Sequence, residues 1–180
     1  MDRPLPVGAY EALKQFLGQW AGTTQWQSTP WGPARSAAAG VTFSRTGAGL
    51  AVTLSYHHSN ADGTHTEGHG VFTVDPDHPD TLWYRVNSLG LPPEPPARAG
   101  WRDGTLTVER HSGHGTARHT YRIADGLLTH TAAVRLGSAG TFTPVMTSVY
   151  RRRPAGAGAA AGPDAGEGLS PGSPRGTSTA

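Results

Sequence analysis

Most of the chain alternates between apolar and polar residues with a period of two, which is the pattern of half-buried β-strands. Dipeptides that favour tight turns, such as Asp62-Gly63, Asp103-Gly104 and Asp125-Gly126, separate several of these segments. The predicted strands cover residues 23–28, 40–45, 50–59, 65–74, 81–88, 98–101, 105–111, 116–123, 127–136 and 141–151. The dominant secondary structure is therefore β.

One segment has helical spacing instead. Residues 9–18 place Tyr10, Leu13, Phe16 and Leu17 on one side, with polar residues on the other. A single short amphipathic helix is thus predicted before the first strand.

Ten short strands in succession, with no helices between them, favour an antiparallel up-and-down meander. Closure into a barrel removes the exposed strand edges that an open sheet would carry, so we predict an all-β barrel over residues 1–153. The Pro-rich residues 91–96 interrupt the pattern and are expected to form a long loop at one mouth.

Composition changes at residue 154. Residues 154–180 consist mainly of Gly, Ala, Pro and Ser, with Leu169 as the only large apolar side chain. A segment of this kind cannot bury enough apolar surface to fold, so we predict a disordered C-terminal tail.

Charge and composition exclude several function classes. The net charge of +2 is small and the basic residues are dispersed, which argues against nucleic-acid binding. The absence of cysteine excludes disulfides and thiol chemistry. No segment has the pattern of a signal peptide or a membrane span, so we expect a cytoplasmic protein, and the preference for arginine over lysine suggests a bacterial genome. The sequence leaves open whether the protein forms a homodimer.

The segment from Val52 to Val74 contains four of the nine histidines. On its first strand, the even positions are the apolar ones, which places Tyr56 and His58 on the inner face. A loop of two or of four residues at Asp62-Gly63 gives the same parity on the second strand. In both registers the inner face would hold Tyr56, His58, His65, Glu67 and His69. A β-bulge would reverse this parity. The predicted parity also turns the apolar Phe72 outward, which is an argument against that parity.

Imidazoles beside a carboxylate can serve two kinds of chemistry. They can bind a divalent metal, or His69 and His58 can act as general acid and base against Glu67. The alternative is that histidines near a hairpin turn are simply solvated. His69, which lies furthest from the turn, is the best candidate.

Further inward candidates lie on later strands. His119 with Tyr121, and His130, each have apolar neighbours two residues away, although lone buried histidines are usually structural. Trp83 and other aromatic residues add the apolar surface that a ligand would need.

The residues Gly18-Gln19-Trp20 after the helix, and Val149-Tyr150-Arg151 at the end of the last strand, resemble the calycins. In that superfamily the Gly-x-Trp tryptophan packs across the closed end of the barrel against a basic residue of the final strand. The resemblance therefore implies a contact between Trp20 and Arg151.

Within the calycins, the runs Glu67-Gly68-His69-Gly70, Val74-Asp75-Pro76 and Tyr121-Arg122-Ile123 look like a bacterial domain-of-unknown-function family of fatty-acid-binding-protein-like barrels, distantly similar to nitrobindins. Nitrobindins ligate haem through a histidine of the last strand, and Pro144 stands near that position here. Fatty-acid-binding proteins hold a carboxylate with arginine and tyrosine, roles for which the resemblance offers Arg118, Tyr121 and Arg122.

Together these features predict a barrel that binds a small apolar or aromatic metabolite, with Tyr56, Trp83, His119, Tyr121 and His130 as ligand contacts. A second hypothesis is an enzyme of the same shape, such as a cyclase or isomerase in biosynthesis, using His69, His58 and Glu67. A third is a haem or metal protein built on the hairpin histidines. No cofactor is required by the first reading.

Overall fold

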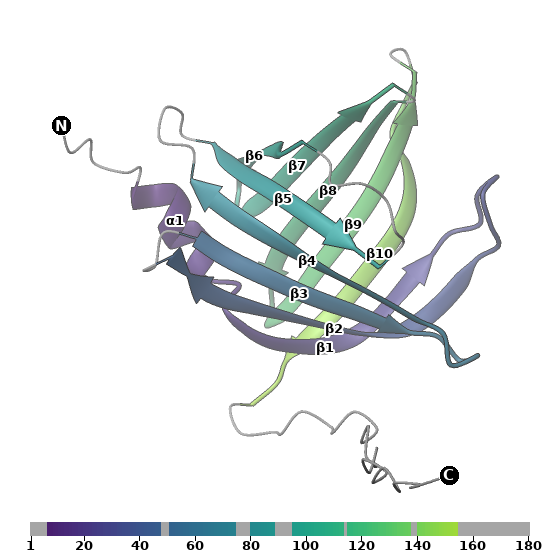
Figure 1. Ribbon diagram of the computed structural model, residues 1–180, viewed down its shortest axis with the longest axis horizontal. Helices are drawn as coiled ribbons and strands as arrows, with labels where there is room; N and C mark the ends of the chain where they lie inside the picture. The colour runs from purple at the N-terminus through teal and green to yellow at the C-terminus, as the bar shows by residue number, and fades with distance from the viewer. Residues whose placement is uncertain are drawn as a thin grey trace, which may run out of the picture.

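The computed structural model describes residues 7–47, 51–74, 80–88, 95–113, 115–137 and 140–154. It contains one short helix, α1 (Val7–Lys14), and ten strands (Figure 1). The strands are β1 (Gly18–Trp26), β2 (Arg35–Thr46), β3 (Ala51–Ser59), β4 (His65–Val74), β5 (Thr81–Asn87), β6 (Ala97–Arg102), β7 (Thr105–Ser112), β8 (Gly115–Ala124), β9 (Leu127–Leu136) and β10 (Thr143–Arg152).

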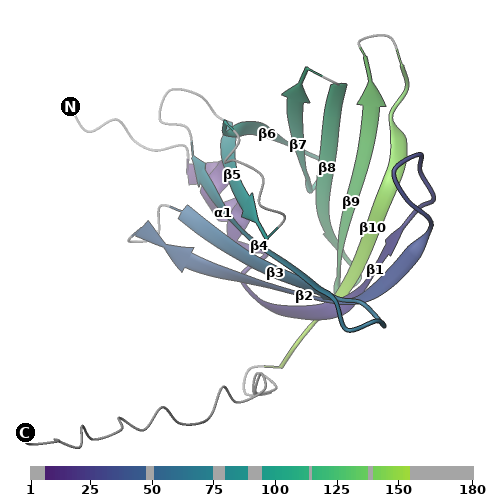
Figure 2. The ribbon, with the colours of Figure 1, turned by 45° about the vertical axis from the view of Figure 1, so that its right-hand side comes forward.

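The strands form a closed barrel in which every strand pairs antiparallel with its neighbours in the chain, and β10 returns to pair with β1. Figure 2 shows β1 and β10 side by side, where the sheet closes on itself. The up-and-down barrel predicted from alternation and turn spacing is confirmed. Closure leaves the first and last strands without a free edge.

The N-terminal elements differ from their predicted bounds. The helix ends at Lys14 rather than at residue 18, and β1 and β2 each begin five residues earlier than predicted. Their first residues are mostly Gly, Ala and Ser, which have low β-propensity, but pairing with neighbouring strands decides their conformation. Gly22 illustrates this, because a Cβ atom there would come within 1.9 Å of the Val149 carbonyl oxygen on β10.

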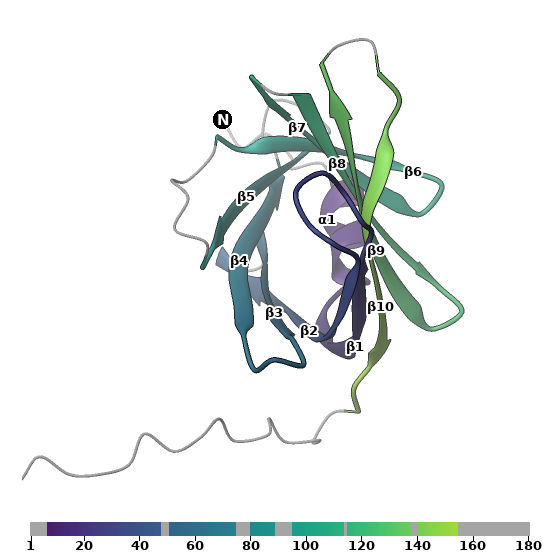
Figure 3. The same ribbon diagram turned by 90° about the vertical axis from the view of Figure 1, so that its right-hand side faces the viewer.

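Aromatic side chains fill the end of the barrel that α1 covers. Phe16, just after the helix, is fully buried and stacks on Phe43 and Trp101, with ring centroids 5.5 and 5.7 Å away. Figure 3 looks along the barrel from the other end, with α1 behind the strands. This end of the barrel is therefore plugged, whereas no helix of the described residues covers the opposite end.

The basic residue that packs on Trp20 is Arg152, not Arg151 as the calycin resemblance implied. Arg152 lies opposite Trp20 in the β1–β10 register, and its guanidinium carbon is 4.2 Å from the centre of the Trp20 ring. It also donates hydrogen bonds to the carbonyl oxygens of Gln15, at 2.9 Å, and Leu17. Arg151 is one residue away, so the alternation of β10 turns it outward into solvent.

Several sequence predictions fall outside the described residues. These are the disordered tail from residue 155 onward, most of the Pro-rich loop at 91–96, and Asp75-Pro76. Within the part of the chain that is described, no helix is long and apolar enough to cross a membrane.

Candidate functional site

The inner face of the barrel becomes polar away from α1. Strand alternation points a small set of polar side chains inward from β3, β5, β7, β8, β9 and β10, among the apolar ones. The set comprises Tyr56, His58, Arg85, Arg110, His119, Tyr121, His130, Ser148 and Tyr150. These residues form the candidate site.

Two histidines and a tyrosine form a stacked unit in this site. His119 Nδ1 and His130 Nε2 are 3.1 Å apart, and the ring of Tyr121 lies parallel to that of His130 at a centroid distance of 4.2 Å. Burial, followed by the charges of Arg85 and Arg110, lowers the pKa of His119 to about 3. Burial, followed by the neighbouring His119, also lowers the pKa of His130 well below its usual value. Both imidazoles are therefore neutral at pH 7, and one ring can donate its N–H to the other.

A second aromatic group lies nearer the open end. The ring of His58 is 5.5 Å from that of Tyr56 and 5.0 Å from that of Trp26. Burial, followed by the nearby His57, Arg35 and Arg85, lowers the pKa of His58 to about 4. His58 is therefore also uncharged at neutral pH.

Arg85 and Arg110 belong to the site, although the sequence analysis did not single them out. Arg85 donates a hydrogen bond from Nη2 to the Tyr56 hydroxyl at 3.1 Å. The guanidinium carbons of Arg85 and Arg110 lie 5.8 and 5.1 Å from the centre of the Trp83 ring. Period-two spacing could have found both, because Arg85 follows the buried Trp83 by two residues and Arg110 follows the buried Val108 by two.

The space enclosed among these side chains is small. A cavity of about 30 Å³ is lined by the apolar residues Val41, Phe43, Leu54 and Leu128 and by the polar residues Tyr56, His58, Tyr121, His130 and Tyr150. That volume suits a water molecule rather than a metabolite. Beside Tyr150, which lines this cavity, the buried hydroxyls of Thr24 and Ser148 are 2.7 Å apart. The barrel is closed as expected, but its interior is more filled than we predicted.

The predicted cluster on the β3–β4 hairpin is only partly present. Tyr56 and His58 face inward, whereas His65, Glu67 and His69 lie on the outer face and are exposed. His69 pairs with Ser55 across the outside of the hairpin, with a 2.9 Å contact from its Nδ1 to the serine hydroxyl. The prediction that all five share one face was wrong.

The length of the connecting loop explains this error. Ser59 pairs with His65, which leaves five loop residues, an odd number, instead of the two or four considered from the sequence. The loop is held by a hydrogen bond from the Asn60 N–H to the Thr64 carbonyl, and by Asp62, whose carboxylate accepts from Thr64. An odd loop reverses the parity of β4, so Phe72 points inward and Glu67 outward.

The inward residues of that stretch are instead its glycines. A Cβ atom at Gly68 would come within 2.5 Å of the Tyr56 ring, and one at Gly70 would come within 2.8 Å of the Trp83 indole nitrogen. The two glycines thus allow these rings to lie flat against β4. The run Glu67-Gly68-His69-Gly70 therefore contributes to the site by leaving room for these two rings, and not by placing a charged side chain in it.

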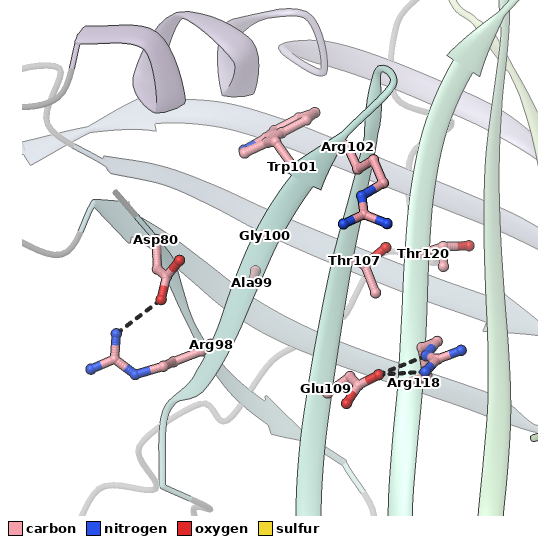
Figure 4. A pocket seen from close by; sticks show the side chains of 10 residues that line it. All are labelled: Asp80, Arg98, Ala99, Gly100, Trp101, Arg102, Thr107, Glu109, Arg118 and Thr120. Atoms are coloured by element: carbon pink, nitrogen blue, oxygen red, sulfur yellow. Dashed lines mark hydrogen bonds and ion pairs between the residues drawn. The ribbon is translucent and has the colours of Figure 1, made fainter. Parts of the chain in front are cut away.

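The arginines suggested by the fatty-acid-binding-protein resemblance point away from the site. Arg118 lies on the outer face and forms an ion pair with Glu109 at 2.6 Å, and Arg122 is exposed. Figure 4 shows this outer groove over β6–β8, in which Asp80 likewise pairs with Arg98 at 3.2 Å. The groove is open and its charges are largely paired, so it is a weaker candidate than the interior. Tyr121, by contrast, faces inward and is buried.

The hairpin histidines do not form a metal site in this fold. His58 is inside and His65 and His69 are outside, so the side chains that the metal hypothesis required do not converge. Across the described residues, no three side chains of His, Asp or Glu gather closely enough to hold a metal ion. Pro144, near the position of the nitrobindin histidine, is exposed beside a register shift in β10.

Comparison with known proteins identifies the fold. No family model matches the chain, and no curated protein matches its sequence. Among solved structures, Rv2717c from M. tuberculosis aligns with a TM-score of 0.60 and 16% identity, covering 84% of this chain and 99% of the other. The S-type phycobiliprotein lyase CPES from Guillardia theta aligns with a TM-score of 0.58 and 11% identity, covering 84% and 94%.

Both alignments extend over nearly the whole of the other chain and over most of this one. Identities this low establish similarity of fold alone. The chain therefore has the same barrel fold as these two proteins.

Proposed function

We propose that this protein binds a small, largely apolar or aromatic molecule in the half of the barrel away from α1. The observation that carries the proposal is the convergence of Tyr56, His58, Tyr121, His130 and Tyr150 on one cavity of a closed barrel. Ligand sites combine apolar and aromatic walls with a few convergent polar groups, and this interior has that composition. The similarity in fold to a protein named a phycobiliprotein lyase is consistent with it.

A ligand needs more room than the enclosed cavity offers, and the barrel mouth supplies it. A hollow of about 480 Å³ lies there, lined by Trp26, Trp31 and Val134 among others. The His58 ring contacts Trp26 on the mouth side and lines the inner cavity on the other. A ligand would therefore reach the interior by displacing His58 and Tyr56.

The interior histidines favour binding over acid–base catalysis. A general acid or base works best with a pKa near the operating pH, but the pKa values of His58 and His119 lie near 4 and 3. His69 and Glu67, the other members of the predicted catalytic set, are outside the barrel. The inner imidazoles are better suited to donating and accepting hydrogen bonds to a ligand.

The proposal is tested with the neutral fluorescent probe N-phenyl-1-naphthylamine. We expect saturable binding with one probe per chain. His58→Trp should weaken it by about tenfold or more, because a larger ring closes the route between mouth and cavity. His57→Trp makes the same change at the adjacent, exposed position and should leave the affinity unchanged. Absence of saturable binding, or equal effects of the two variants, would refute an interior site.

A further inference from the structure

We propose that the ligand has a flat, fused aromatic body, and that this body stacks on the indole of Trp31 in the hollow at the barrel mouth. This inference rests on the proposed function and specifies the shape and the chemical class of its ligand. It makes Trp31, which lies outside the enclosed cavity, the residue that decides which ligands the barrel accepts.

The sizes of the two spaces place most of the ligand at the mouth. The enclosed cavity measures about 30 Å³, whereas the mouth hollow measures about 480 Å³. Sites for small organic molecules usually measure about 300 to 1,000 Å³, so of these two spaces the hollow alone has room for the body of a ligand. The residues that line the hollow therefore determine which molecules fit.

The hollow lies between the β1–β2 connection and the neighbouring strands β9 and β10. Figure 2 shows this connection beside β10, to which the Gln27 N–H donates a hydrogen bond at the Val145 carbonyl, at 3.0 Å. Most of the lining residues are apolar or aromatic: Trp26, Trp31, Pro33, Val134 and Val145. Among the described residues that line the hollow, Arg35 is the one charged side chain. The lining therefore suits an apolar body.

Trp31 is held at the surface by a tight turn. Thr29 and Gly32 exchange two backbone hydrogen bonds, at 2.9 and 3.1 Å, and the Trp31 N–H donates to the Thr29 hydroxyl at 3.2 Å. The residue is nevertheless 65% exposed. An exposed tryptophan alone has no functional meaning, but this one is fixed against a hollow of ligand size with apolar walls. A ring stacked on it would remove apolar surface of both partners from water.

The second tryptophan of the hollow is already partly covered. The Arg35 guanidinium carbon lies 4.4 Å from the centre of the Trp26 ring, and the His58 ring meets that ring edge-on at 5.0 Å. Trp31, by contrast, contacts no other aromatic ring or guanidinium group among the described residues. The ring of Trp31 is therefore the one in the hollow that is free to stack on a ligand.

His58 orients the ligand in the hollow. It contacts Trp26 on the mouth side and lines the enclosed cavity on the other. Its imidazole is uncharged at neutral pH, so it can donate or accept a hydrogen bond to a hydroxyl or carbonyl group at one end of the aromatic body. The ligand class is therefore a flat aromatic molecule with a small, uncharged polar end.

The test compares two alcohols that have the same number of carbon atoms, the flat 2-naphthalenemethanol and the globular 1-adamantanemethanol, by isothermal titration calorimetry. Burial of apolar surface alone would bind them about equally. We expect the flat alcohol to bind more tightly to the wild-type protein by about fivefold or more, because aromatic stacking adds to the burial of area.

Three variants locate the preference. Trp31→Leu keeps an apolar side chain but removes the ring, so it should abolish the preference for the flat alcohol, whereas Trp31→Phe should retain most of it. Tyr84→Leu removes an exposed ring from the outer face of β5 and should have no effect. Trp31 is exposed, so we expect its variants to fold as the wild type does, and the wild-type comparison decides the inference in any case.

The outcomes separate this inference from the proposed function. If the two alcohols bind the wild type equally, or if Trp31→Leu and Tyr84→Leu have the same effect, the inference is wrong. Saturable binding of N-phenyl-1-naphthylamine that His58→Trp weakens would then still support an interior site. If neither the alcohols nor that probe bind, both proposals are wrong.

Size-exclusion chromatography tests the other possible occupant of the hollow, a second copy of the chain. We expect the wild type and Trp31→Leu to elute alike. A wild-type dimer that Trp31→Leu separates would show that a second copy covers the ring, and would overturn the inference.

Discussion

At the scale of single residues, the face of the strand decides what a side chain can do. His57 and His58 are consecutive on β3, yet His57 is exposed, whereas His58 is only 8% exposed and contacts two aromatic rings. The same rule separates Arg85 from its exposed neighbours Tyr84 and Val86. Residue type alone identified the histidines as candidate site residues. The alternation of the strand decided which of them is buried and which is exposed.

The buried His119 gives the protein a defined pH dependence. Its pKa is about 3 in the folded protein and about 6.5 in the unfolded chain, so the unfolded chain binds the proton first as the pH falls. The stability present above pH 6.5 is therefore lost progressively towards pH 3. Between pH 7 and pH 5 we expect a loss of about 2 kcal/mol from this residue.

Urea unfolding at pH 7 and pH 5 measures this effect. The unfolding free energy should fall between pH 7 and pH 5 in both proteins, but the fall should be smaller in His119→Gln than in the wild type by about 2 kcal/mol. The exposed His65→Gln controls for the loss of a histidine as such. If both variants behave like the wild type, burial of His119 is not the origin of the pH dependence.

At the scale of elements, the β3–β4 hairpin shows that a loop selects which residues enter the barrel. Its five-residue connection places Thr66, Gly68, Gly70 and Phe72 inward and the charged members of β4 outward. Burying the charged Glu67 would cost far more free energy than burying Thr66, so the observed register is also the more stable one. The loop and the hydrophobic pattern therefore favour the same pairing.

Substitution of Gly63 tests whether the conformation of this loop is constrained. Its φ of +82° lies in the left-handed region, and a Cβ atom there would meet no atom within 4 Å, so an alanine would suffer backbone strain alone. We expect Gly63→Ala to lower the unfolding free energy by about 1 kcal/mol. Gly32→Ala, in another connection where a Cβ atom would also meet nothing, should be close to neutral. Equal stabilities of the two variants would show that the loop conformation is not constrained.

At the scale of the whole molecule, closure joins the two ends of the described chain. β1 and β10 pair from Trp20 opposite Arg152 to Trp26 opposite Met146. Arg152 connects three parts at once, because it contacts Trp20 on β1 and the chain that leads out of α1 at Gln15 and Leu17. The plugged end of the barrel is held by this junction and by the aromatic residues beneath it.

Removing the junction should destabilise the whole barrel. We expect Arg152→Ala to lower the free energy of unfolding by about 1 kcal/mol, because the cation–π contact and the hydrogen bonds to two carbonyl groups are lost at a solvent-accessible site. Arg151→Ala removes the same charge one residue earlier and should change it by less than about 0.5 kcal/mol. Urea denaturation of the two variants measures the difference. A larger effect at Arg151 would restore the pairing that the calycin resemblance implied.

The sequence by itself determined the number of strands, their order and the closed barrel, because alternation and turn residues are local signals that ten successive segments repeat. It also determined that Tyr56, His58 and Tyr121 face inward, since each lies two residues from an apolar or aromatic residue on an uninterrupted strand: Leu54, Tyr56 and Ile123 respectively.

Only the tertiary structure decided the composition of the site. The positions of His65, Glu67 and His69 depended on whether one loop had an odd or an even number of residues, and the partner of Trp20 depended on the register between two strands more than a hundred residues apart. The grouping of Arg85 and Arg110 around Trp83 required the barrel to bring β5 and β7 together. Alternation within a strand is set locally, whereas register and neighbourhood are set by pairing between strands, and pairing is a property of the folded chain.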